Sequence, residues 1–360
     1  ARLHERSLAV TGCKLSGLAG LYVHFLLQAH AWMAPGAISG WLIPSEFMDV
    51  NYGREVKRYL LNKVTLLQIH RFSPDDVQFA DALVSSAVVW IKNEAPAADH
   101  QPLFTFGGTL SAPQLTRSVR SQDLASEAKW SRFPRHEVRG DEACGSQQLG
   151  DLFSIKRGLA TGDNKFFVLT EKQVKDREIP GSVLRPILPS PRYVKDDEIQ
   201  TDHDGLPTNV DRLFLLDPKM DEDEIRQVHP ALASYLEEGR ASGVHEGYLC
   251  RGRKRWYDQE QRGPAPIVCT YMGRSDGKSG RPFRFVRNRS QATVANTYLA
   301  MYPKHALQER LDQDPGLMDR LWQQLNAISP EVLLGEGRVY GGGLHKLEPK
   351  ELSKVPLILE

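Results

Sequence analysis

The chain has 360 residues, 41% hydrophobic and 25% charged, a composition typical of a soluble protein with more than one core. Its 46 basic and 45 acidic residues nearly cancel, so net charge alone indicates neither a nucleic-acid nor a membrane partner. The four cysteines stand far apart without CxxC or CxH spacing, which argues against structural zinc and is typical of a reducing cytoplasm. The longest apolar stretch, 18–43, is interrupted by polar residues and Pro35. With no recognisable signal peptide, we expect a cytoplasmic protein without a membrane span.

Helical and strand patterns alternate over residues 1–95. Apolar residues at helical spacing predict a helix over 18–33, followed by a buried strand. A second helix comes next, with Ser45 or Asn51 able to cap its start, and then two strands rich in branched residues. The strands are expected over 37–43, 64–72 and 81–91. This order predicts an α/β fold, the second half of a doubly wound, Rossmann-like sheet.

The chain changes character after this region. Residues 96–145 are polar and broken by prolines, and we interpret them as a connector. Residues 146–360 show short strands between Gly and Pro turns, which predicts a mixed α+β domain. Its strands are expected over 149–155, 165–169, 213–216, 267–272, 283–286 and 293–301, and its helices over 222–228, 230–239, 316–328 and 349–354.

Several motifs follow one another in a particular order. They are LYVHF at 21–25 with PGAISGWLIPSEF at 35–47, VQFADALV at 77–84, LGDLFSI at 149–155 with a later Thr-Gly pair, and GGGLHKLEP at 341–349 with VPL at 355–357. In this order they resemble the back half of the gamma-class, amino-group adenine DNA methyltransferases of restriction–modification systems. In that family a target-recognition domain follows the catalytic domain, and the order of the two predicted regions in this chain agrees with it.

The resemblance implies S-adenosylmethionine as cofactor, double-stranded DNA as partner and an adenine flipped out of the duplex for methylation of its exocyclic amino group. Two parts of such enzymes are absent from the sequence: the glycine-rich turn for the cofactor and the Asn/Asp-Pro-Pro-Tyr/Phe element, since no Pro-Pro pair occurs. We therefore expect this chain to be a fragment that needs an upstream catalytic half of the same protein and transfers no methyl group alone.

The resemblance assigns roles to residues of the first region. It implies that Phe79, in a hairpin loop before a strand, stacks on the flipped adenine; the alternative is a hydrophobic plug. It implies that Phe25, and less clearly Tyr22, contacts the cofactor adenine, although a Phe on an amphipathic helix is more often a core residue. Pro44 follows a strand end and would form a wall of the cofactor site, and for Ser45 helix capping explains the residue equally well.

The DNA contacts are expected in the second region. Residues 251–289 hold eleven basic and three acidic residues, interleaved with aromatic rings, and Lys and Arg are the residues that contact phosphates. Arg255 and Trp256 can instead be structural, with the cation stacked on a ring. The Gly-bounded loop 156–165 and the residues after the 341–343 glycines are further candidates. The predicted DNA-binding residues are Lys156, Arg157, Asn164, Lys165, Arg251, Arg253, Lys254, Arg255, Trp256, Arg274, Lys278, Arg281, His345 and Lys346.

Other chemistry finds little support in the sequence. The acidic cluster 221–224 is typical of a helix start, and no two-metal nuclease pattern accompanies it, so we expect no metal site. The main alternative function is a non-catalytic DNA-recognition module that works with a partner subunit. A third possibility is a single-chain enzyme whose nuclease part lies outside this segment; otherwise a separate cognate restriction nuclease is the expected partner.

Overall fold

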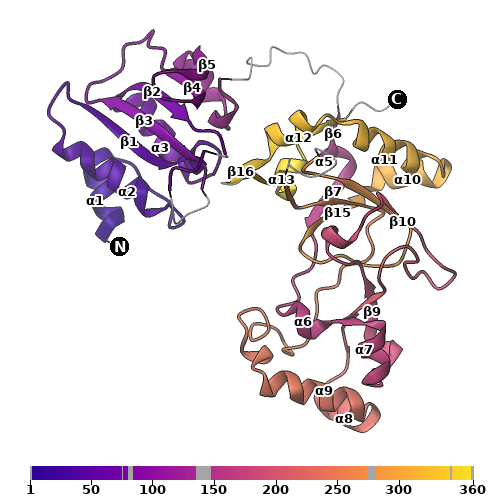
Figure 1. Ribbon diagram of the computed structural model, residues 1–360. Helices are drawn as coiled ribbons and strands as arrows, with labels where there is room; N and C mark the ends of the chain where they lie inside the picture. Colours follow the sequence, from indigo (N-terminus) through magenta and orange to yellow (C-terminus); the bar gives the residue numbers. More distant parts are fainter. Residues whose placement is uncertain are drawn as a thin grey trace. The chain divides into compact units, whose positions relative to one another are not determined.

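The computed structural model describes residues 2–74, 76–79, 84–134, 147–274, 281–340 and 343–357 (Figure 1). The chain forms two compact units. Unit 1 comprises residues 1–144 and 338–345, and unit 2 comprises residues 145–337 and 346–360. The chain therefore passes from one unit to the other three times. Among the described helices, none has the length and apolar character needed to cross a membrane.

Unit 1 is built on a five-stranded mixed sheet with the order β1-β3-β2-β4-β5. Its elements are α1 (Arg2–Thr11), α2 (Leu21–Ala29), β1 (Ile38–Pro44), α3 (Gly53–Asn62), β2 (Thr65–Arg71), β3 (Ser86–Lys92), β4 (Leu103–Gly108) and β5 (Pro113–Ser118). Only β2 and β4 are parallel; the other pairs are antiparallel. The apolar residues of α2 and α3 share one core with the inward residues of β1, β2 and β3.

Strand β1 differs from the buried strand that the sequence predicted. Among the strands that the structure describes, β1 lies at the edge of the sheet and pairs with β3 alone, and its side chains alternate between the core and solvent. Ile43 is buried, whereas Ile38 and Leu42 are 59% and 44% exposed. The prediction was wrong because a continuous apolar run does not require burial on both faces of a strand, and only one face of β1 joins the core.

The start of α3 also differs from the prediction. Neither Ser45 nor Asn51 caps the helix; Tyr52 precedes it without a side-chain cap. Ser45 instead opens a 3₁₀ turn, η2 (Ser45–Met48), and its hydroxyl donates to the carbonyl of Ser85 at 3.1 Å. This turn buries Phe47 completely, so the chain already contributes a large side chain to the core before α3 begins.

The segment expected as a connector, 96–145, supplies ordered elements to unit 1. Besides β4 and β5 it forms α4 (Ser121–Ser126) and η3 (Trp130–Arg132). Phe104 and Trp130 are both buried, with their rings edge to face at 6.0 Å. These two large side chains explain why this stretch, polar on average, packs against the sheet.

Unit 2 contains a five-stranded sheet, order β10-β14-β12-β15-β7, and a three-stranded sheet, order β8-β11-β9. Its strands include β6 (Gln147–Gln148), β7 (Phe153–Arg157), β8 (Val168–Thr170), β9 (Leu184–Ile187), β10 (Glu198–Ile199), β11 (Leu213–Leu216), β12 (Ile267–Thr270), β13 (Met272–Arg274), β14 (Phe285–Asn288), β15 (Tyr298–Pro303) and β18 (Pro356–Leu357). The helices are α5 (Leu149–Leu152), α6 (Asn164–Phe167), α7 (Glu171–Asp176), α8 (Glu222–Val228), α9 (Pro230–Ala241), α10 (His305–Gln313), α11 (Leu317–Ala327), α12 (Pro330–Glu336) and α13 (Pro349–Leu352).

The predicted mixed α+β character of this region is confirmed, with local exceptions. Helix α8 and strand β11 have the predicted bounds, and Asp221 caps α8 by accepting from the backbone of Glu224 at 3.0 Å. The predicted strands at 149–155 and 165–169 begin instead with the short helices α5 and α6, and extended structure starts only at β7 and β8. The Asp151 carboxylate accepts from the backbone N–H of Gln148 just before α5, and the Asp163 carboxylate accepts from the backbone N–H of Lys165 in α6, so both helix starts are capped.

Candidate nucleic-acid interface

Two of the predicted DNA-binding segments form one structure in unit 2. The loop that follows β7, residues 158–165, lies against the loop between α9 and β12 at residues 247–256. Arg253 joins them, because its guanidinium donates to the carbonyls of Ala160 and Thr161 at 2.8 and 2.9 Å. Cys250, which is buried, underlies the same contact: a Cβ placed on Gly162 would lie 2.7 Å from its Sγ. We call these residues the interlocked loops.

Gly158 opens the first of these loops at a point of very close backbone approach. A Cβ on Gly158 would lie 2.1 Å from the carbonyl oxygen of Ala295, a distance that real side chains do not adopt. The Gly158 N–H donates to the Tyr298 carbonyl at 2.9 Å, and Leu159 continues along residue 295 as an isolated bridge. Glycine therefore allows the loop to leave β7 while it remains attached to the strand region that leads into β15.

The polar residues of the first loop are divided between structural and exposed roles. Asp163 caps α6 by accepting from the backbone N–H groups of Lys165 and Phe166, at 2.8 and 3.2 Å. Thr161 is buried and donates to the Asn164 amide oxygen. The side chains of Asn164 and Lys165 are exposed. The loop therefore presents one amide and one ammonium group to solvent on a fixed backbone.

A second group of predicted residues gathers around Tyr271, also within unit 2. The Arg157 guanidinium lies 4.2 Å from the centre of the Tyr271 ring, and the Lys346 ammonium lies 5.2 Å from it. The Tyr271 hydroxyl donates to Glu348 at 2.8 Å, and Glu348 also pairs with Lys346 at 2.8 Å. Burial raises the pKa of the Tyr271 hydroxyl, so this residue is a neutral donor and a platform for two cations. Residues far apart in the chain thus converge here.

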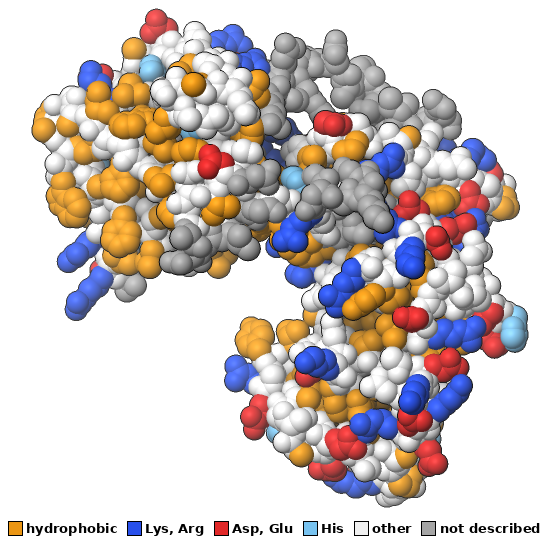
Figure 2. Space-filling model, in the orientation of Figure 1, with side chains coloured by type: hydrophobic (Ala, Val, Ile, Leu, Met, Phe, Trp, Pro, Cys, Tyr) orange, Lys and Arg blue, Asp and Glu red, His pale blue; other side chains and the backbone are white. Residues whose placement is uncertain are grey.

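The basic run at 251–289 is less basic in three dimensions than in the sequence. Acidic residues from other segments pair with its arginines: Asp197 with Arg284, Glu198 with Arg289, and Asp319 with both Arg287 and Arg289. Arg255 pairs with the nearby Asp258 and Arg262 with Glu260. Figure 2 agrees, since Lys and Arg alternate with Asp and Glu over the visible face of unit 2. These arginines contribute mainly to the fold.

Trp256 belongs to the core of unit 2, which is the structural role that the sequence left open. It is 8% exposed and packs among Phe166, Phe167 and Tyr257, with ring centres 5.6, 6.0 and 5.6 Å away. Arg253 and Arg255 are only partly exposed and bond backbone carbonyls. His345, on β17 (Leu344–Lys346), is buried.

A smaller set of the predicted cations is exposed. Among the described residues, Lys156, Lys165, Arg251 and Lys254 are exposed and form no ion pair. Arg274 is exposed on β13, and Arg281 is exposed and donates to the carbonyl of Asn326 at 3.0 Å. Lys278 lies outside the described residues. The exposed cations on the interlocked loops are therefore the group best placed to meet a phosphate backbone.

In unit 1, a chain of hydroxyl groups links the elements that carry the predicted cofactor residues. Tyr22, one helical turn from Phe25 on α2, shares a hydrogen bond of 3.1 Å with Tyr52, which donates to Glu46 at 3.3 Å. Glu46 lies in the turn that begins directly after Pro44. Burial is the main cause that raises the pKa of both tyrosines. Sequence reasoning assigned neither Tyr52 nor Glu46 a role: Glu46 lies in the 35–47 motif without a function assigned to it, and Tyr52 lies outside every motif.

Phe25 does not take the core position that its helix suggested. It is 59% exposed, whereas the neighbouring Val23, Leu26 and Leu27 are buried. The Phe79 side chain is partly exposed. The residues at 80–83 that follow it lie outside the described part of the chain.

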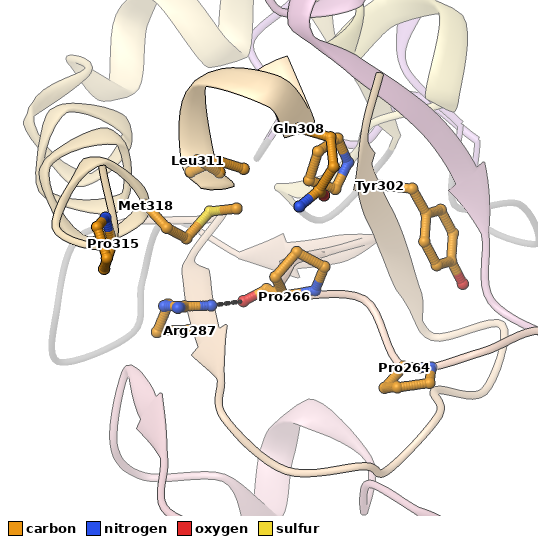
Figure 3. A pocket seen from close by; sticks show the side chains of 9 residues that line it. Pro264, Pro266, Arg287, Tyr302, Gln308, Leu311, Pro315 and Met318 are labelled. Carbon is orange, nitrogen blue, oxygen red and sulfur yellow. Dashed lines mark hydrogen bonds between the residues drawn. The ribbon is translucent and has the colours of Figure 1, made fainter. Parts of the chain in front are cut away.

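A pocket of about 470 Å³ opens elsewhere on unit 2, beside α10 and α11 (Figure 3). Its lining combines Leu311, Met318 and Pro266 with the polar side chains of Gln308 and Arg287. Among the described residues of the lining, the cation is Arg287, which donates to the Pro266 carbonyl at 2.8 Å and to Asp319 at 3.0 Å. Because this guanidinium is already engaged, the pocket offers little for recognition of an anion.

Comparison with known proteins places this geometry in a family. Residues 137–359, more than half of the chain, match the family described as Type II methyltransferase M.Eco57I, C-terminal domain. The chain belongs to this family. The matched region contains the interlocked loops, the residues around Tyr271 and the pocket, and it includes none of the strands β1 to β5 of unit 1.

Two relatives extend the likeness to nearly the whole chain. Type II methyltransferase M.XamI of Xanthomonas campestris pv. amaranthicola is 27% identical over 98% of this chain, which covers 62% of that protein. Type II methyltransferase M.AccI of Acinetobacter calcoaceticus is 25% identical over 95% of this chain and 63% of its own length. The chain thus spans somewhat over six tenths of these relatives.

A solved structure shares the fold of this M.Eco57I family member. It is the Type IIL restriction–modification enzyme MmeI, determined in complex with DNA. The two match with a TM-score of 0.51 at 12% identity, over 84% of this chain and 38% of that protein. The expectation of a restriction–modification methyltransferase C-terminal part is confirmed by the family match and the relatives.

Proposed function

We propose that this chain is the C-terminal part of a site-specific DNA methyltransferase that transfers a methyl group to the exocyclic amino group of an adenine. Unit 2 recognises the DNA, and the sheet of unit 1 is the end of a Rossmann-like catalytic domain. The observation that carries the proposal is the pair of interlocked loops, which hold exposed cations on a fixed backbone inside the region that matches the family. The methyltransferase relatives and the DNA-bound neighbour of the same fold support it.

DNA recognition falls to the exposed residues of unit 2 rather than to the whole basic run. Lys156, Lys165, Arg251 and Lys254 are exposed and have no ion pair with any residue that the structure describes, so each can neutralise a phosphate at little cost in lost internal contacts. Asn164 presents an amide, which can pair with base edges. Arg253 acts on these residues through the backbone, since it holds both loops in place.

The contribution of unit 1 is a part of the catalytic pocket. The cofactor S-adenosylmethionine supplies the methyl group when bound. Phe25 fits a contact with its adenine because the ring is exposed on α2, and Pro44 fits a neighbouring wall because the Tyr22–Tyr52–Glu46 bonds tie that helix to the turn after β1. Phe79 offers a partly exposed ring for the flipped adenine, whose lost stacking an aromatic face replaces.

The surface of unit 1 supports the view that this part completes its fold with further residues of the intact enzyme. Hydrophobic side chains gather over its visible face (Figure 2). Leu18 and Trp32 are each 85% exposed, and Ile38 and Leu42 extend along the edge strand β1. A free strand edge beside exposed apolar side chains is a surface that proteins normally cover. In the intact enzyme the upstream part of the catalytic domain covers it.

The test is fluorescence anisotropy of the folded chain with a mixed-sequence DNA duplex over a series of salt concentrations. We expect saturable binding that weakens steeply with salt. Replacing both Arg251 and Lys254 with Ala should reduce the slope of log affinity against log salt by about 2, because two phosphate contacts are lost. The matched control replaces Lys172 and Lys175 on α7 and should leave the slope unchanged.

Three results would contradict the proposal. A folded sample that does not bind at low salt would show that unit 2 does not recognise DNA by itself. Equal loss of slope in the Arg251/Lys254 and Lys172/Lys175 variants would show that the interlocked loops are not the contact surface. Methyl transfer by the isolated chain would contradict its role as an incomplete part of the enzyme.

A further inference from the structure

The tip of the second interlocked loop presents two apolar side chains to solvent. Tyr248 is 81% exposed and Leu249 next to it is 42% exposed. Exposed apolar residues are ordinary when they are scattered, but this pair stands at the end of a loop, next to cations. In Figure 1 the chain between α9 and β12 projects beside α6. Neither residue was singled out in the sequence, because a lone Tyr-Leu pair has no motif.

Backbone hydrogen bonds and a buried cysteine fix the loop that carries this pair. Gly247 and Arg251 form consecutive turns, with backbone bonds to Val244 at 3.1 Å and to Gly247 at 3.0 Å. Cys250, directly after the exposed pair, is fully buried against the first loop. The backbone therefore keeps Tyr248 and Leu249 out of the core although burial would favour both side chains. An ordered loop that exposes apolar groups indicates a surface shaped for a partner.

The surroundings of the pair identify the chemistry of that partner. The Arg251 guanidinium lies 5.7 Å from the Tyr248 ring centre, and Lys254 follows on the same loop without an ion pair among the described residues. Aromatic or apolar side chains flanked by cations match nucleic acid, in which flat bases are bordered by phosphates. An acidic protein surface would use the cations but would not require an exposed ring.

We infer that Tyr248, supported by Leu249, is a wedge that enters the base stack of the bound duplex while Arg251 and Lys254 hold the adjacent phosphates. The inference rests on the proposed DNA-recognition function of unit 2 and deepens it, since it assigns a base-step contact to a particular side chain. A wedge of this kind partly unstacks one step and bends the duplex. Flexible pyrimidine–purine steps should therefore be preferred at that position.

The test compares Tyr248→Ala with Tyr248→Phe and with Tyr193→Ala in the full chain. Tyr193 is a matched control because it is 58% exposed under the guanidinium of Arg192, 4.7 Å from its ring centre, but lies away from the interlocked loops in sequence. We expect Tyr248→Ala to lower duplex affinity by about five- to a hundredfold, the range of one lost base stack, with an unchanged melting temperature. Tyr248→Phe and Tyr193→Ala should bind like the parent chain.

A second readout separates stacking from simple contact. With the parent chain bound, permanganate should oxidise an unstacked thymine at one step of the duplex, and end-to-end fluorescence transfer should report a bend. Both signals should disappear with Tyr248→Ala at saturating protein. If the parent chain binds DNA but Tyr248→Ala keeps its affinity, bend and thymine reactivity, the wedge is overturned while the proposed function stands. If the folded parent chain binds no DNA, both are overturned.

Discussion

Replacing Arg253 with Met distinguishes an arginine that builds the DNA surface from one that contacts DNA. The Arg253 guanidinium makes two good hydrogen bonds, at 2.8 and 2.9 Å, to carbonyls of the opposite loop, and a longer one of 3.5 Å to Trp256. A hydrogen bond from a charged donor contributes about 1.5–3 kcal/mol when buried. Because Arg253 is partly exposed, we take roughly half of the sum over these three hydrogen bonds. We therefore expect the unfolding free energy of unit 2 to fall by about 2–4 kcal/mol.

The matched control is Arg251→Met, two residues away on the same loop but exposed. Its expected effect on stability is within about 0.5 kcal/mol, as for other surface changes. Urea unfolding measures the global effect, and hydrogen exchange of peptides covering 158–167 and 247–257 localises it. We expect faster exchange in both peptides for Arg253→Met alone. An unchanged unfolding midpoint together with a loss of DNA affinity equal to that of Arg251→Met would refute the structural assignment of Arg253.

Three further predictions concern Gly158, His70 and Phe79. Gly158→Ala should destabilise unit 2 by about 1–3 kcal/mol in thermal unfolding, since its Cβ would meet the Ala295 carbonyl at 2.1 Å, while Gly181→Ala, in open space, should be nearly neutral. Burial lowers the pKa of His70 below 6.5; as pH falls through 6.5 the unfolded chain takes up the proton first, so stability should decrease, and a melting temperature that rises toward pH 5 would contradict this. In the intact enzyme, Phe79→Ala should reduce 2-aminopurine fluorescence from base flipping more than DNA binding; equal losses would argue for a general structural role.

The elements with strong local signals were predictable from the sequence. Helix α8 begins directly after Asp221 because the Asp221 carboxylate and the following acidic residues favour a helix start, and this signal needs no tertiary information. For strand β1 the sequence predicted the position along the chain but not the exposure of one of its faces. Whether its second face is covered depends on which elements pack there, and Ile38 and Leu42 carry no local mark of their exposure.

The candidate DNA surface was predictable only in part, for a reason visible in its charges. Counting residues along 251–289 finds eleven basic and three acidic side chains, but the acids that neutralise Arg284, Arg287 and Arg289 come from residues 197–198 and from Asp319. Charge along a segment and charge on a surface are different quantities. Likewise, only the fold could bring Arg157 and Lys346 onto the same Tyr271 ring.

The path of the chain between the units has a consequence for engineering. Residues 338–345 return to unit 1, where Ser85 donates to the Val339 carbonyl at 3.0 Å, before the chain re-enters unit 2. A truncation of the chain near residue 145 would remove this contact from unit 1. A transplant of all residues after 145 would replace unit 2 together with residues 338–345 of unit 1. A graft meant to change recognition should instead replace the stretch up to Gly337 and the tail from Lys346, and keep the host's own eight residues between them.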